Sequence, residues 1–390
     1  MVGSVPFGTE PILVQGETRM IIYNTDYKRE NMIYPELEKW QFYPFNEYDI
    51  KDMCFFDIET TGLSPETSNI YLIGAGYYTE DGFNIIQWFA DDYKSEENIL
   101  KEFFDFISDY KVIFQYNGNT FDIPFVKKKA KQYGMDIECF EGLKKLDLYV
   151  MLRKYAGMFG LPDKKLKSFE QYVGLIREDE ADGGILIDVY VKYIHNKLMG
   201  KDDETMLQEL LLHNYEDVFG LSQVASLLYL KDFEKLNVSF ENCSLKDTEL
   251  VIRYKCFVPY NCSFCVNDTI EVSCVDNEII IRARLFKDNL KYYFKDYKDY
   301  YYMLEEETVM HKSVAVYTDA SVRRKAKKAE CFVTKDGLYL PVFKPGVFSD
   351  NYHIFRKDYT AKDYYIDMDD VDLKDDEFMC DYYRQVVNSI

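Results

Sequence analysis

Two carboxylates, Asp57 and Glu59, stand one residue apart inside the apolar run Cys54–Leu63. A β-strand has a period of two residues, so both acids would face the same side of a strand. Neighbouring carboxylates repel each other near a core, and a hard cation with oxygen ligands is the common reason to keep them there. Taken alone, the pair is better explained by an edge strand with a solvated acidic face. Acids further along the chain favour a metal site instead.

Two further acids are placed to join this pair. Asp122 ends the segment Asn119–Asp122, at the start of an expected helix, and Asp217 lies on a longer one, four residues after His213 and on the same helix face. Acids from three segments predict two divalent cations, Mg²⁺ or Mn²⁺, for phosphodiester hydrolysis. His213 is the predicted general base, because an unperturbed imidazole titrates at about pH 6.5. The predicted metal ligands are Asp57, Glu59, Asp122 and Asp217.

The order of the surrounding elements indicates how these acids could meet. Periodicity and turn residues predict three strands, a helix, a strand and a helix, over 53–60, 70–78, 83–90, 95–110, 111–116 and 122–133. Further helices are expected over 143–154 and 168–174, and a long one begins at 202 or 203 and ends at 230. This order describes an α/β fold, a ribonuclease-H-like mixed sheet flanked by helices, with the first strand at its centre.

Composition restricts the class of protein. The chain has 390 residues, enough for two domains, and its apolar content of 47% is typical of a globular protein. No apolar run is long enough to span a membrane, no secretory leader opens the chain, and nine scattered cysteines do not resemble a disulfide framework. These features predict a cytoplasmic protein without membrane contact. A net charge of −21 argues against coating nucleic acid but allows a local basic groove.

The chain is expected to divide into three parts. Residues 1–50 show no clear periodicity and form an N-terminal lead-in, whereas residues 51–231 hold the ribonuclease-H-like domain. Residues 232–390 are rich in predicted strands and form a second, β-rich (α+β) domain of open role, with a hairpin over 331–343. Its acidic tail, residues 367–381, is expected to be solvated and mobile. The sequence leaves any protein partners open.

Three motifs resemble those of a known superfamily. Phe56–Leu63 is similar to the first motif of the DEDD 3′–5′ exonucleases, Asn119–Asp122 to the second, and His213 with Asp217 to the third. Within that superfamily the chain most resembles the YprB-type ribonuclease-H-like proteins. The segments that carry this likeness are Ile86–Ala90, Phe121–Pro124 and Arg177–Asp179. The likeness covers residues 50–230. His213 stands at the spacing that the superfamily's Tyr-containing third motif has, so the resemblance supports the four acids more strongly than the base.

The resemblance implies a metal-dependent 3′–5′ exonuclease that acts on single-stranded DNA or RNA. The backbone at Thr60 and Thr61 would meet the terminal 3′-hydroxyl, and Leu63 would pack on the last base. Asn119 would cap the second helix or contact substrate, and the basic residues Lys165 and Lys167 would hold phosphates or form a solvated face. A structure-specific endonuclease and a non-catalytic nucleic-acid-binding scaffold are the alternatives. The intact set of four acids favours an enzyme.

Overall fold

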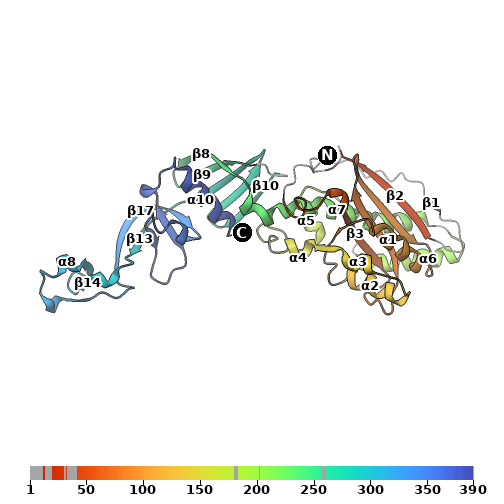
Figure 1. The fold of residues 1–390 in the computed structure, drawn as a ribbon, viewed down its shortest axis with the longest axis horizontal. Helices are drawn as coiled ribbons and strands as arrows, with labels where there is room; N and C mark the ends of the chain where they lie inside the picture. Colours follow the sequence, from red (N-terminus) through yellow and green to blue (C-terminus); the bar gives the residue numbers. More distant parts are fainter. Residues whose placement is uncertain are drawn as a thin grey trace. The chain divides into compact units, whose positions relative to one another are not determined.

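The computed structural model describes residues 12–13, 20–29, 32, 42–179, 183–201, 203–256 and 261–389. The chain divides into two compact units, Met1–Asp232 and Phe233–Ile390, which Figure 1 shows in sequence colours. Across these described ranges, no helix has both the length and the apolar character that crossing a membrane requires.

The first unit is built on a mixed sheet. Within the described residues it has seven strands in the order β1-β2-β5-β4-β3-β6-β7. Their bounds are β1 Ile12–Leu13, β2 Met20–Lys28, β3 Met53–Thr60, β4 Ile70–Tyr78, β5 Gly82–Ala90, β6 Val112–Gln115 and β7 Lys144–Asp147. Strand β3 lies inside the sheet, antiparallel to β4 and parallel to β6. The predicted ribonuclease-H-like mixed sheet is confirmed.

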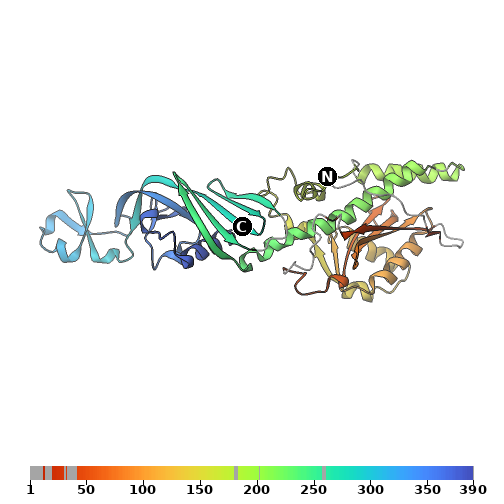
Figure 2. The ribbon, with the colours of Figure 1, turned by 90° about the horizontal axis from the view of Figure 1, so that it is seen from above.

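Helices cover both faces of this sheet. Figure 2 shows the sheet between one layer containing α1 and α2 and another containing α6 and α7. The helices of the first unit are α1 Glu96–Ile107, α2 Asp122–Gln132, α3 Glu138–Gly142, α4 Leu148–Leu152, α5 Leu166–Tyr172, α6 Gly183–Leu198 and α7 Glu204–Val224. Helix α1 packs its buried apolar residues, among them Ile99 and Phe103, against β4 and β5. Helix α7 contacts β3, β4 and β5 from the opposite side.

The alternation along β3 decides which of its side chains meet α7. Phe56 and Ile58 are buried on the α1 side, where the rings of Phe56 and Phe103 lie 5.4 Å apart. Asp57 and Glu59 therefore face α7. The period of two that the sequence suggested is the reason why both acids reach the same helix.

The second unit is β-rich, as predicted. Its described residues form a five-stranded sheet (β10-β11-β12-β9-β8), a closed barrel (β13-β17-β19-β18) and a three-stranded sheet (β15-β14-β16). The bounds are β8 Ser239–Lys246, β9 Glu249–Lys255, β10 Cys262–Asn267, β11 Ile270–Val275, β12 Glu278–Arg284, β13 Phe286–Tyr293, β14 Tyr300–Met303, β15 Thr308–His311, β16 Arg323–Lys325, β17 Phe332–Val342, β18 Ile354–Arg356 and β19 Tyr364–Asp367.

The prediction of a mobile acidic tail is wrong. Residues 367–381 include the short helix η7, Met368–Asp370, and the first half of α10, Asp376–Val387. Asp375 caps α10 by accepting hydrogen bonds from two backbone N–H groups, at 2.9 and 3.2 Å. Phe378 and Met379, which belong to the tail, are among the buried residues of this helix, as are Tyr382 and Tyr383 just beyond it. The acids thus serve the helix N-terminus, while the aromatic residues between them form its packed face.

Two predicted elements also differ in kind. The helix expected over 143–154 is strand β7 followed by α4, because Asp147 ends the strand and caps the helix by accepting the N–H of Val150 at 3.3 Å. The hairpin expected over 331–343 is the single strand β17, of which residues 332–339 pair with β13. The residues expected to form the turn, 335–337, therefore lie within a continuous strand.

Candidate active site

Three elements bring the predicted acids to one place. Asp57 and Glu59 belong to β3, Asp122 is the first residue of α2, and Asp217 lies on α7. Burial raises the pKa of Asp57 and of Glu59, and the negative charges of Asp217 and Asp122 raise both further. The four acids therefore form one electrostatic cluster.

Asp57 is held by the amide of Asn214 on α7. Asn214 Nδ2 donates to the Asp57 carboxylate at 3.0 Å and to its carbonyl oxygen at 3.3 Å. Gln87 Nε2 in turn donates to Asn214 Oδ1 at 2.9 Å, which orients the amide. Gly74 lies opposite Asp57 in the β3–β4 register, and a Cβ atom at that position would collide with the Asn214 side chain. The glycine makes room for the amide that fixes Asp57.

Asp122 is tied directly to β3. Its Oδ1 accepts a hydrogen bond from the backbone N–H of Ile58, the residue between the two β3 acids, at 3.3 Å. The loop before α2 approaches closely at Gly118, where a Cβ atom would stand 2.9 Å from Asp122 Oδ2. Asp147 fixes this loop by accepting the backbone N–H of Asn119 at 3.2 Å. The exposed Asn119 does not cap α2, since Phe121 holds the cap position.

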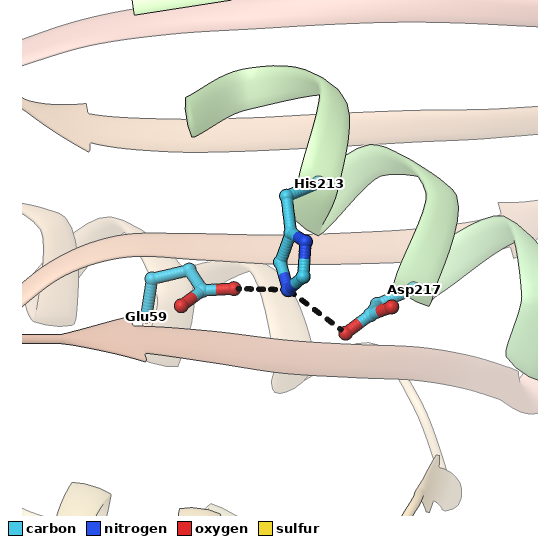
Figure 3. A group of neighbouring side chains, drawn as sticks. All are labelled: Glu59, His213 and Asp217. Atoms are coloured by element: carbon cyan, nitrogen blue, oxygen red, sulfur yellow. Dashed lines mark ion pairs between the residues drawn. The ribbon is translucent and has the colours of Figure 1, made fainter. Parts of the chain in front are cut away.

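His213 reaches the acids from α7. Its Nε2 lies 3.7 Å from Glu59 Oε1 and 3.8 Å from Asp217 Oδ2. Figure 3 shows the ring between the two carboxylates. The possible ligand atoms of Glu59, His213 and Asp217 all lie within 4.8 Å of one another. That span is close to the diameter of a coordination sphere with bonds of about 2.1 Å. The other ring nitrogen of His213, Nδ1, lies 2.6 Å from Asp179 Oδ2.

A buried arginine, to which the sequence analysis assigned no role, also contacts the cluster. Arg177 pairs with Asp217, and Glu170 orients its guanidinium through hydrogen bonds of 2.5 Å from Nε and 2.6 Å from Nη2. Gly220 on α7 leaves room for this pair, because a Cβ atom there would collide with the Glu170 carboxylate. Burial raises the pKa of Glu170 to about 7. The only sequence signal for this contact was the family-like segment Arg177–Asp179.

The electrostatics of the site suit divalent cations. Burial is the largest cause of the raised pKa of Asp57 and of Glu59, followed by repulsion from Asp217. Burial also raises the pKa of Asp122 to about 7, against the lowering effect of backbone hydrogen bonds. Carboxylates that repel one another in a buried site provide oxygen ligands whose repulsion a hard cation removes. The residues present therefore fit the predicted metal ions.

We expect the metal-free protein to lose stability as the pH rises. A carboxyl group whose pKa is higher in the folded than in the unfolded state stabilises the fold below its unfolded pKa, about 4. That stabilisation is lost as the pH rises through the folded pKa, which is about 7 for Asp122. Mn²⁺ binds the deprotonated groups, so it should raise the melting temperature more at about pH 8 than at about pH 5. Thermal unfolding with and without Mn²⁺ checks this, and equal gains at both pH values would contradict it.

The residues predicted to hold the 3′ end lie around the end of β3. Thr60 is buried and its hydroxyl donates to the Gly62 carbonyl at 2.9 Å. The Thr61 N–H donates to the Asn69 carbonyl at 2.8 Å. Leu63, two residues later, is 83% exposed. This turn is thus fixed by hydrogen bonds and presents one apolar side chain to solvent.

The two predicted basic residues are placed differently. Lys167 on α5 donates from Nζ to Asp179 Oδ2 at 3.2 Å, which joins it to the carboxylate beside His213. Lys165 is exposed just before α5, where its backbone N–H donates to Asp163 at 2.9 Å. The structure therefore brings Lys167 close to the acid cluster, and it places Lys165 at the surface.

Residues 54–229 match a family model described as the RNase_H superfamily. The matched stretch contains all four acids and His213. The description names no subgroup, so the likeness to YprB-type proteins stays a prediction.

Among curated proteins, a DNA polymerase of Methanocaldococcus jannaschii is 33% identical over 92 residues, which cover 21% of this chain and 6% of that protein. A DNA polymerase of Pyrococcus glycovorans is 26% identical over 155 residues, covering 30% of this chain and 20% of the relative. The chain spans at most 20% of the length of these two relatives.

Two solved structures are similar to part of the chain. The family B DNA polymerase from the hyperthermophilic archaeon Pyrobaculum calidifontis has a TM-score of 0.38 and 19% identity, and the match covers 47% of this chain and 26% of that one. E. coli exonuclease I in complex with a dT13 oligonucleotide has a TM-score of 0.28 and 13% identity, covering 51% of this chain and 54% of that one.

Proposed function

We propose that the RNase H superfamily domain of residues 54–229 is a metal-dependent 3′–5′ exonuclease that hydrolyses single-stranded DNA or RNA. The observation that carries this proposal is the meeting of four acids from β3, α2 and α7 beside His213, with the pKa values of three of them raised. A buried set of repelling carboxylates destabilises a protein unless it binds cations. The four acids are Asp57, Glu59, Asp122 and Asp217.

We assign these acids as the ligands of two Mg²⁺ or Mn²⁺ ions. When bound, such ions stabilise the attacking and the leaving oxygen of an in-line displacement. Asn214 holds the Asp57 carboxylate and the Ile58 N–H holds Asp122, so both ligands keep their places between turnovers. His213 presents Nε2 beside Glu59 and Asp217, where it would accept the proton of the attacking water.

The substrate end is assigned to the turn after β3. The backbone at Thr60 and Thr61 would contact the terminal 3′-hydroxyl, and the exposed Leu63 would pack against the last base. Asn119 stands on the exposed loop before Asp122, and Lys165 and Lys167 stand around the start of α5, where they would meet phosphate groups. Phosphate contacts from lysines would give salt-dependent binding.

A non-catalytic scaffold explains the site less well than an enzyme does. A scaffold would gain stability by replacing Asp57 or Glu59, because either replacement removes repulsion between carboxylates. All four acids are nevertheless present together. A structure-specific endonuclease would use the same ligands and is distinguished by the substrates it cuts. The cytoplasmic location stays a prediction from composition.

The deciding experiment is hydrolysis by the purified full chain. The protein is incubated with Mn²⁺, or with Mg²⁺, and 5′-labelled single-stranded DNA or RNA. We expect a ladder of labelled products that shortens step by step from the 3′ end, and we expect a chelator to abolish it. Intact DNA and RNA with both metals would contradict the proposed function.

A further inference from the structure

A buried carboxylate that the proposed chemistry does not use lies directly behind His213. The side chain of Asp179 is 3% exposed, and its Oδ2 lies 2.6 Å from His213 Nδ1. Lys167 Nζ donates to the same oxygen at 3.2 Å, and Arg177 Nη1 lies 4.0 Å from it. Two cationic neighbours stabilise the ionised carboxylate, which can only accept hydrogen bonds. His213 Nδ1 must then be the nitrogen that carries the hydrogen.

The position of that hydrogen decides what His213 can do. A neutral imidazole with hydrogen on Nδ1 has a lone pair on Nε2. In His213 this lone pair faces the space between Glu59 and Asp217, at 3.7 and 3.8 Å from their oxygens (Figure 3). Those two carboxylates would by themselves attract a hydrogen onto Nε2, and the ring could then no longer accept a proton from water. A stronger acceptor on the Nδ1 side is needed to prevent this.

The backbone of Asp179 is fixed to the same helix as His213. The N–H groups of Glu178 and Asp179 donate to the Glu216 carboxylate on α7 at 2.8 and 3.0 Å. Glu216 directly precedes Asp217, so the segment Glu178–Asp179 is anchored beside the two site residues of α7, His213 and Asp217. A carboxylate held in this way keeps its direction toward the ring without ordering at the moment of reaction.

We infer that Asp179 is a positioning residue, which fixes His213 with hydrogen on Nδ1 and the Nε2 lone pair toward Glu59 and Asp217. The effect of Asp179 on catalysis rests on the proposed nuclease function, whereas its effect on the tautomer of His213 does not. The proposed mechanism leaves the family-like segment Arg177–Asp179 unused, and this inference gives a role to its first and its last residue. Arg177 pairs with Asp217, and Asp179 directs His213.

The tautomer of His213 can be observed directly. The chain has four histidines, so the ¹⁵N–¹H multiple-bond spectrum of the imidazole rings contains few signals, and His213→Gln identifies the relevant set. In the metal-free protein at about pH 8, we expect His213 to carry hydrogen on Nδ1. Asp179→Asn should shift the ring toward the form with hydrogen on Nε2. A wild-type ring with hydrogen on Nε2 would overturn the inference, whether or not the chain is a nuclease.

The kinetic consequence is tested by a double-mutant cycle. Asp179→Asn should lower kcat about 10- to 100-fold, with KM for a short oligonucleotide little changed. In a His213→Gln background the same change should cost less than about threefold, because the ring that Asp179 directs is gone. Equal losses in the two backgrounds would show that Asp179 acts on the fold in general, and the inference would be wrong.

Asp91→Asn is the matched control. Asp91 is also a buried aspartate, it accepts from the Tyr193 hydroxyl at 2.6 Å, and it pairs with Lys197 on α6. Its replacement should lower the melting temperature yet keep kcat within about twofold of wild type. A loss of kcat as large as that of Asp179→Asn would overturn the inference. Absence of hydrolysis by the wild type would overturn the proposed function alone, because the spectrum still reports on Asp179.

Discussion

Asp57→Asn is expected to lower the rate of hydrolysis by about 10³-fold. A loss of this size follows the removal of a group that stabilises the transition state. The same change is expected to make the metal-free protein more stable. The amide can still accept the hydrogen bond from Asn214 but carries no charge for a cation. The substitution also removes repulsion from Asp217, Asp122 and Glu59. Burial is the largest cause of the raised pKa of Asp57, and this repulsion is the next. The melting temperature should therefore rise by roughly 2–4 °C, the shift that 1 kcal/mol produces in a domain of this size.

Single-turnover hydrolysis and thermal unfolding without metal measure the two effects on one sample. Asp188→Asn, at an exposed position on α6, is the control and should change neither quantity. Near wild-type activity in Asp57→Asn would contradict the ligand assignment. A lowered melting temperature would contradict the electrostatic account of the site.

A strand blocked at its 3′ end is expected to be cut at least about 100-fold more slowly than the same strand with a free 3′-hydroxyl. The turn at Thr60–Thr61 is closed by hydrogen bonds to Gly62 and Asn69, so it offers a fixed place for a strand end. A closed circular single strand, which has no end, should remain intact. Rapid cutting of the circle would contradict an exonuclease and support the endonuclease.

Leu63 provides the matching test within the protein. Its side chain is 83% exposed and would lose its contact with the terminal base on Leu63→Asp. We expect KM to rise about tenfold, since burying a leucine side chain against another apolar surface is worth about 1.5–3 kcal/mol. Leu198, on α6, is 73% exposed, and Leu198→Asp should leave KM unchanged. Equal effects of both changes would indicate a general response to surface charge.

The sequence predicted best the features that depend on neighbouring residues. Strands β3 and β4 begin and end where the period-two pattern and turn residues placed them, at Met53–Thr60 and Ile70–Tyr78. The spacing of Asp57 and Glu59 also suffices to place both on one face. Local patterns thus predicted the sheet that carries the site.

The supporting contacts depend on residues far apart in the chain, and they escaped prediction. Arg177 reads as an ordinary surface cation until folding buries it against Glu170 and Asp217. Helix α6 and strand β2 were not predicted, because their burial depends on packing against the rest of the first unit. The prediction of a mobile acidic tail failed for a related reason. The charge of the segment suggested solvation, whereas the aromatic residues between the acids determine how it packs.

The hydrogen bonds between Asn214 and Asp57 join residues 157 positions apart, and this separation bears on how the chain is made. At about 5–20 residues per second, a ribosome needs roughly 8–30 s to add that length. Throughout this time the nascent chain carries Asp57, Glu59 and then Asp122, but α7 with Asp217 and His213 does not yet exist. The proposed nuclease would acquire activity only when its first unit is nearly complete, so a half-made chain could not degrade the messenger from which it is being translated.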